Sequence, residues 1–118
     1  MKLRISNQSL RLRINQDDLQ QLVSTGKIEE TFGNDIMGRI AYSLLTCESE
    51  KIDIKLSSGH ITVMIPLSFV SEWNSTDRVS FEQHISGVRV LLEKDFQCLT
   101  ERPHEDESLN FKNPKIQH

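Results

Sequence analysis

The feature that most constrains the fold is a strand-and-helix pattern in residues 2–27. Leu3 and Ile5 alternate with charged residues, and the same period of two returns in residues 10–14, which indicates two half-buried strands. The polar stretch between them is typical of a turn. Asn15 then provides an N-cap, and apolar residues follow at helical spacing. A β-hairpin followed by a helix is therefore predicted here.

The same pattern returns in residues 51–78, where two alternating segments precede a short helix that begins near Pro66. At an offset of 51 positions the matching pairs are Leu10 with Ile61, Leu12 with Val63, Ile14 with Ile65, Leu19 with Val70, Leu22 with Trp73, Lys27 with Arg78, and Ile28 with Val79. The first strands match only if the second hairpin turn is two residues longer. We interpret this correspondence as an internal duplication.

Each half is predicted to end in two more strands. Apolar residues mark them at 28–32, 40–44, 79–81 and 88–92, with three extra loop residues in the first half. The expected fold class is α+β, with about eight mostly antiparallel strands in a barrel-like or two-layer arrangement and two short helices. Two pseudo-symmetric ββαββ halves would build it.

The chain is short enough to form one domain over residues 1–118. Within it we expect half-repeats at about 1–47 and 50–95, followed by a C-terminal arm at 96–118. The duplicated pattern does not include this arm, so the residues of the arm are candidates for a functional site.

Composition narrows the classes of function. The net charge of −3 argues against general affinity for nucleic acid. Cys47 and Cys98 stand apart and form no CxxC motif, which fits a reducing, cytoplasmic location. The first residues contain no signal-peptide pattern, and no apolar run reaches the roughly 20 residues of a membrane span. We expect a cytoplasmic protein that does not associate with membranes.

Several segments resemble a family of short, uncharacterised bacterial proteins. The resemblance covers nearly the whole chain and is carried by residues 10–33, residues 60–82, the sequence VLLEKDFQCL at 90–99, and the ending Phe111-x-Asn113-Pro114. It implies no assigned activity, cofactor or catalytic residue. It does imply that the C-terminal arm belongs to the protein domain.

The C-terminal arm contains residue types that bind metals or act as nucleophiles. Asp95, Cys98 and His104 could form a metal site or a reactive thiol with a base. The spacing matches no recognised signature, and a thiol buried under the arm explains Cys98 equally well. We therefore predict no metal and no cofactor, and keep a small metal- or thiol-dependent enzyme as an alternative.

The first hairpin carries four basic side chains on one face: Lys2, Arg4, Arg11 and Arg13. Such a cluster is often an ordinary solvated face, but like charges across a hairpin repel and favour a counter-charge. That charge could be a phosphate, nucleic acid, a partner's acids or the acidic run 105–107 of this chain, which we favour. The matching positions Asp53 and Thr62 are not basic.

The sequence contains no Gly-rich phosphate loop, HExxH, CxxC or GxSxG motif. The favoured interpretation is a non-enzymatic binding domain whose partner is another protein or a second copy of the chain. The alternatives are the enzyme with Asp95, Cys98 and His104, and binding of an anionic ligand or nucleic acid on the basic hairpin face.

Overall fold

A computed structural model describes residues 1–96 of the 118-residue chain as eight strands and two helices. In chain order these are β1 (Lys2–Ser6), β2 (Ser9–Ile14), α1 (Gln16–Thr25), β3 (Lys27–Asn34), β4 (Gly38–Cys47), β5 (Asp53–Ser57), β6 (His60–Pro66), α2 (Leu67–Ser75), β7 (Ser80–Ile85) and β8 (Val88–Lys94). Each half of the chain therefore runs ββαββ. The predicted α+β class and its element order are confirmed.

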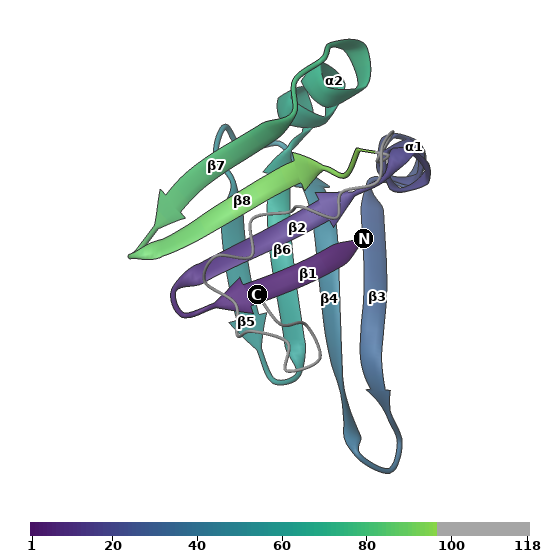
Figure 1. Ribbon diagram of the computed structural model, residues 1–118, viewed down its shortest axis with the longest axis vertical. Coiled ribbons are helices and arrows are strands. Elements are labelled where there is room, and N and C mark those ends of the chain that lie inside the picture. Colours follow the sequence, from purple (N-terminus) through teal and green to yellow (C-terminus); the bar gives the residue numbers. More distant parts are fainter. Residues whose placement is uncertain (97–118) are drawn as a thin grey trace, which may run out of the picture.

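The strands form two four-stranded sheets, and each sheet takes one hairpin from each half (Figure 1). The first sheet has the order β1-β2-β8-β7 and the second has the order β3-β4-β6-β5. The two central pairs, β2 with β8 and β4 with β6, are parallel, and the four outer pairs are antiparallel. Neither half completes a sheet by itself.

The strand registers of the two sheets correspond. Leu12 lies opposite Leu92 in the first sheet, and Val63 lies opposite Leu44 in the second. The comparison of the two halves matches Leu12 with Val63, and it matches the segment around Leu44 with the segment around Leu92. The two sheets are thus related residue by residue along their central strands.

The first strands of the two halves, β1 and β5, correspond although the turn of the second hairpin is no longer than that of the first. Leu3 lies opposite Leu12, and Ile54 lies opposite Val63, so the offset of 51 holds through both hairpins. The prediction of two extra turn residues is wrong. It arose because Ile52 is apolar and buried yet precedes β5, where its backbone N–H donates to Gln83 Oε1 at 2.9 Å.

The predicted match of Ile28 with Val79 is also wrong. Ile28 lies opposite Leu44 on β3, and the residue in that place on β7 is Phe81, opposite Leu92. After α1, Gly26 alone turns the chain, in a left-handed conformation with φ of 78°. After α2 the chain needs residues 76–79 to reach β7.

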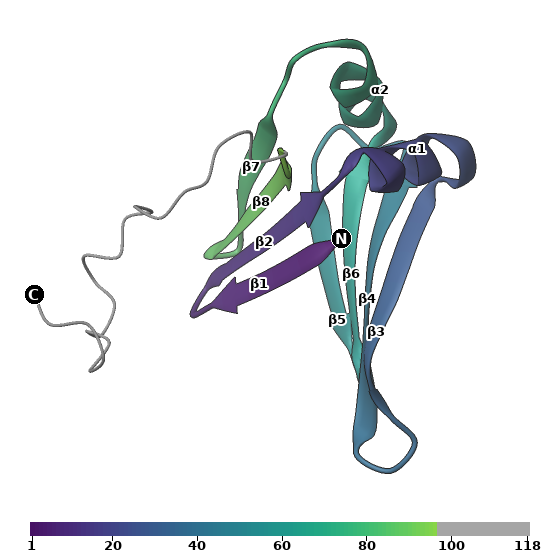
Figure 2. The ribbon, with the colours of Figure 1, turned by 45° about the vertical axis from the view of Figure 1, so that its right-hand side comes forward.

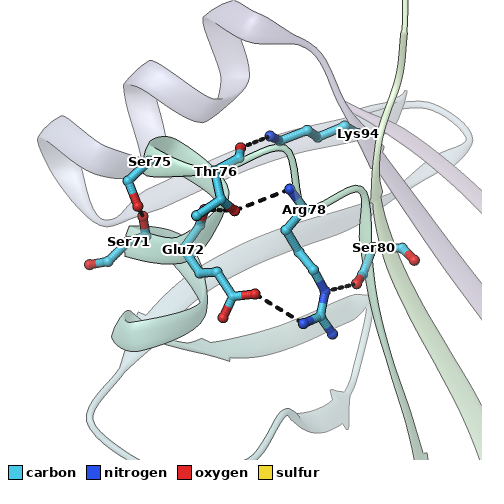
Figure 3. Close-up of polar contacts among 7 residues, drawn as sticks. All are labelled: Ser71, Glu72, Ser75, Thr76, Arg78, Ser80 and Lys94. Carbon is cyan, nitrogen blue, oxygen red and sulfur yellow. Dashed lines mark hydrogen bonds and ion pairs between the residues drawn. The ribbon is translucent and has the colours of Figure 1, made fainter.

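Arg78 organises this longer connection (Figure 3). Its guanidinium donates to Glu72 Oε2 at 2.9 Å and to the carbonyl of Ser80 at 2.8 Å, and its backbone N–H donates to Thr76 Oγ1 at 3.1 Å. The guanidinium also lies 4.3 Å from the ring centroid of Phe81. These contacts give Arg78 a structural role, and its guanidinium needs no ligand to satisfy it.

The two helices lie at the same end of the molecule, and the sheets diverge away from them (Figure 2). Asn15 and Asp18 form a capping box that starts α1. Leu22 of α1 and Trp73 of α2 are each about 1% exposed and join the core between the sheets. The helices close one end of the core, which leaves the opposite end to the strand turns.

Candidate functional site

The hairpin of β3 and β4 extends beyond the other strands at the end opposite the helices (Figures 1 and 2). Phe32 lies opposite Ile40, and residues 33–39 separate them. In the second half the corresponding pair is Ile85 and Val88, which only a two-residue turn separates. The β3–β4 hairpin is longer than its counterpart by more than the three residues predicted. The α2–β7 connection is also longer than the α1–β3 connection, and in the sequence comparison this difference offsets part of the longer hairpin.

The backbone of this hairpin requires two glycines near its tip. Gly33 has φ of 113°, and a Cβ there would lie 2.1 Å from the carbonyl oxygen of Gly38. Gly38 has φ of 95° but open space around it. A side chain at position 33 would clash, whereas one at position 38 would only strain the backbone.

Side-chain contacts complete the tip. Asn34 Oδ1 accepts hydrogen bonds from the backbone N–H groups of Ile36 and Met37, at 3.0 and 2.9 Å. Arg39 lies 2.9 Å from Asp35 in an exposed ion pair. The tip is therefore a defined turn that holds two apolar residues in solvent.

Six large apolar side chains are exposed at this end of the molecule, and we call them the apolar shelf: Ile5, Phe32, Ile36, Met37, Ile40 and Leu56. Ile36 is 97% exposed, Leu56 72% and Phe32 69%. Phe32 and Ile40 follow the inward alternation of their strands. They are exposed because the first sheet does not extend far enough to cover them.

The shelf is large for a surface that faces only water. If a fully exposed large apolar residue presents roughly 200 Å², the exposed fractions of the six residues add up to about 800 Å², an upper bound for the patch that they form. The largest apolar patch on a typical monomer is roughly 300–600 Å². Apolar exposure above this range is typical of surfaces that bind a partner.

An apolar cleft of about 430 Å³ opens beside the shelf, between the ends of the β1–β2 and β5–β6 hairpins. Its apolar lining includes Ile5, Leu10, Ile40, Ile54, Leu56 and Ile61. Ile5 and Leu56 occupy equivalent positions in the two halves, as do Leu10 and Ile61. The cleft thus lies where the two halves meet at the end of the core that the helices leave open.

The four predicted basic residues do lie together, on the outer face of the first sheet. Lys2 is opposite Arg13, and Arg4 is opposite Arg11. Glu93 Oε1 lies 2.6 Å from Arg13 Nε and 3.5 Å from Arg11 Nε. Glu93 was missed in the sequence because only the parallel β2–β8 pairing places it opposite Arg13.

Asp95 provides the second counter-charge, through a 2.8 Å contact with Lys2 Nζ. The hydrogen bond from Lys2 lowers the pKa of Asp95 from its ordinary value; desolvation opposes this effect, and the charges of Lys2 and Arg13 add to it. Within residues 1–96, no carboxylate forms an ion pair with Arg4. Positive charge therefore remains concentrated at Arg4 and its neighbour Arg11.

Of the proposed Asp95–Cys98–His104 cluster, only Asp95 belongs to the described residues, and its partner is Lys2. Cys98, His104 and the acidic run 105–107 lie outside them. Among residues 1–96, no group of three or more histidine, cysteine or acidic side chains could hold a metal ion. Within the same range, no helix is both long and apolar enough to cross a membrane.

Two other polar contacts were not foreseen. The buried hydroxyl of Ser43 lies 3.1 Å from His60 Nε2, which satisfies a polar group on the second sheet. His84 Nε2 lies 3.3 Å from Glu82. Because Ser43 is only 3% exposed, its hydroxyl is closed to a substrate, and the pair has a structural role.

A protein-family model, described as a family of unknown function (DUF7009), matches residues 1–115. The chain belongs to this family. The matched range contains the apolar shelf, the cleft and the basic face, together with residues 97–115. No curated protein matches the chain. The resemblance to an uncharacterised family is therefore confirmed, and the family brings no activity with it.

Proposed function

We propose that the protein is a binding domain that associates with a second copy of itself through the apolar shelf. The observation that carries this proposal is the area of the shelf. About 800 Å² for each partner is the size of a standard stable protein–protein interface. Burial of the same patch on both partners would remove the exposed apolar surface from water.

The chemistry of the shelf favours a second copy over an unrelated partner. Homodimer interfaces are more apolar than transient ones, and among the described residues no aspartate, glutamate, lysine or arginine lines the cleft beside the shelf. In a twofold interface one patch contacts its own copy, so its charges must complement themselves. Asp35 and Arg39 at the tip already pair with each other within one copy, so the tip adds no net charge to such an interface.

Sedimentation equilibrium of the full chain tests the proposal. We expect a monomer–dimer equilibrium with a dissociation constant in roughly the micromolar range. Phe32→Asp should weaken it at least about tenfold, because a charge would be buried in an apolar interface. Leu67→Asp is the matched control, since Leu67 is also exposed but begins α2 at the far end. A wild-type chain that stays monomeric at high concentration contradicts self-association.

The basic face favours a second candidate function, the binding of an anionic group such as a phosphate at Arg4 and Arg11. The two guanidiniums are direct cross-strand neighbours, where like charges repel. Glu93 is nearer to Arg13 than to Arg11, and Arg4 has no ion pair within residues 1–96. A dianion between them would supply the missing charge and suits the forked geometry of arginine.

Titration with inorganic phosphate and pyrophosphate, followed by NMR of the arginine Nε–H signals, tests this candidate. We expect saturable shifts at Arg4 and Arg11 that weaken with added salt and disappear in Arg4→Gln. Lys55→Gln is the matched control, since Lys55 occupies the position equivalent to Arg4 on β5. If neutralising residues 105–107 moves these signals while phosphate does not, the occupant is the chain's own acidic run.

We also propose that the two ββαββ halves arose by internal duplication. Equal offsets in both hairpins and corresponding central registers support this origin. The protruding β3–β4 hairpin and the basic face then mark places where one half has acquired features of its own. A cytoplasmic location is consistent with Cys47, a thiol that would remain reduced there.

A further inference from the structure

We infer that the tip residues Ile36 and Met37 of one copy insert into the apolar cleft of the other copy. This inference rests on the proposed self-association and specifies which surfaces meet. The cleft and the tip would then be the two complementary parts of one interface.

The tip is built to be inserted. Ile36 is 97% exposed and Met37 69% exposed, although a solvent-facing turn has no need of large apolar residues. The hydrogen bonds from both backbone N–H groups to Asn34 hold the turn in one conformation. Such preorganisation lowers the entropic cost of binding, and a β-turn offers a narrow projection that fits a cleft.

The cleft can receive the tip. An engineered apolar cavity of roughly 150 Å³ accommodates a benzene molecule, so about 430 Å³ leaves room for two side chains of this size. Leu56 is 72% exposed and Ile5 56% exposed on its opposite walls. An inserted tip would cover both of these residues, which no strand of the described chain covers.

The tip cannot enter the cleft of its own chain. Ile40 lines the cleft, and the hairpin continues from Ile40 away from it to the tip. A return would require β3 and β4 to fold back on themselves. A twofold axis that crosses the hairpins near Phe32 and Ile40 instead lays them antiparallel and brings each tip to the other copy's cleft.

Disulfide trapping between two different chains tests this arrangement. With Cys47→Ser and Cys98→Ser as background, one chain carries Met37→Cys and the other carries Leu56→Cys. After mixing and mild oxidation we expect the mixed disulfide to form at least about tenfold faster than with Val23→Cys in place of Met37→Cys. Val23 is a matched control because it is exposed on α1, at the helix end.

Ile36→Asp provides an independent measurement that leaves the core untouched. We expect it to weaken the dimer at least about tenfold in sedimentation equilibrium. If the wild-type chain dimerises but Ile36→Asp has no effect and no mixed disulfide forms, the insertion is wrong and the self-association stands. A monomeric wild-type chain overturns both.

Discussion

At the scale of single residues, the outer face of the first sheet depends on two carboxylates at the end of β8. One oxygen of Glu93 contacts both Arg11 and Arg13, and Asp95 contacts Lys2. Glu93 is the more buried of the two, with a side chain 17% exposed. Its loss would leave two guanidiniums close together without a counter-charge.

We therefore expect Glu93→Gln to lower the free energy of unfolding by about 1–2 kcal/mol, as for a charge-assisted hydrogen bond. Glu82→Gln is the control, since Glu82 pairs with Arg89 on the exposed part of the same sheet and should lower stability less than Glu93→Gln does. Urea unfolding at low and high salt measures both. Equal losses in the two variants would contradict a special role for Glu93.

Asp95 makes stability depend on pH. Its pKa is lower in the folded chain than in the unfolded chain, first because Lys2 donates a hydrogen bond to it. Its ionised form therefore stabilises the fold above the unfolded pKa of about 4, and this contribution is lost as the pH falls through the folded pKa. We expect Asp95→Asn to be less stable than wild type at pH 7, by a difference that shrinks as the pH falls below about 4. A difference that stays constant over this range would exclude the Lys2 contact as its cause.

At the scale of elements, the β3–β4 hairpin differs most from its counterpart. The tip is held by local contacts around Gly33 and Asn34, whereas the β7–β8 hairpin ends in a two-residue turn. We expect Gly33→Ala to disrupt the tip, because its Cβ would meet the carbonyl of Gly38. Gly38→Ala should cost about 1–2 kcal/mol, because a residue with a Cβ disfavours its positive φ.

Amide hydrogen exchange at Ile36 and Met37 distinguishes these two variants. These two N–H groups donate hydrogen bonds to Asn34. They should lose protection from exchange in Gly33→Ala and keep most of it in Gly38→Ala. Dimer affinity should fall with protection if the tip is part of the interface. Unchanged protection in Gly33→Ala would mean that the turn can adopt another conformation without loss.

At the scale of the whole molecule, the two halves depend on each other. The central strand β2 pairs with β8, and β4 pairs with β6, so each sheet needs strands from both halves. Fragments 1–49 and 50–118 should therefore lack cooperative unfolding when alone. When mixed, they should recover the far-UV circular dichroism of the intact chain. A fragment that unfolds cooperatively by itself would contradict this dependence.

Much of the fold follows from local pattern. Alternation located the strands, Asn15 predicted the start of α1, and the offset of 51 related Leu12 to Val63. Errors occurred where one apolar residue did not belong to the pattern. Ile52 is buried outside a strand, and Val79 lies in the α2–β7 connection rather than on β7.

Less of the candidate site was predictable. The sequence placed four basic side chains correctly on one face: Lys2, Arg4, Arg11 and Arg13. Alternation alone determines which face of a strand a side chain occupies. Their partner Glu93 was not predicted, since it lies 80 positions from Arg13. The shelf was also missed, because Phe32 and Ile40 follow the pattern of core residues. The apolar pair Ile36-Met37 within a predicted loop was the available signal.

By itself the sequence determined which residues form strands and helices, and which face of each strand is apolar. These are properties of neighbours along the chain, set by backbone geometry and side-chain spacing. Only the tertiary structure decided which strands are adjacent and how far each sheet extends. Pairing of distant strands depends on burying both halves together, so it brought Glu93 to Arg13 and left Phe32 and Ile40 exposed.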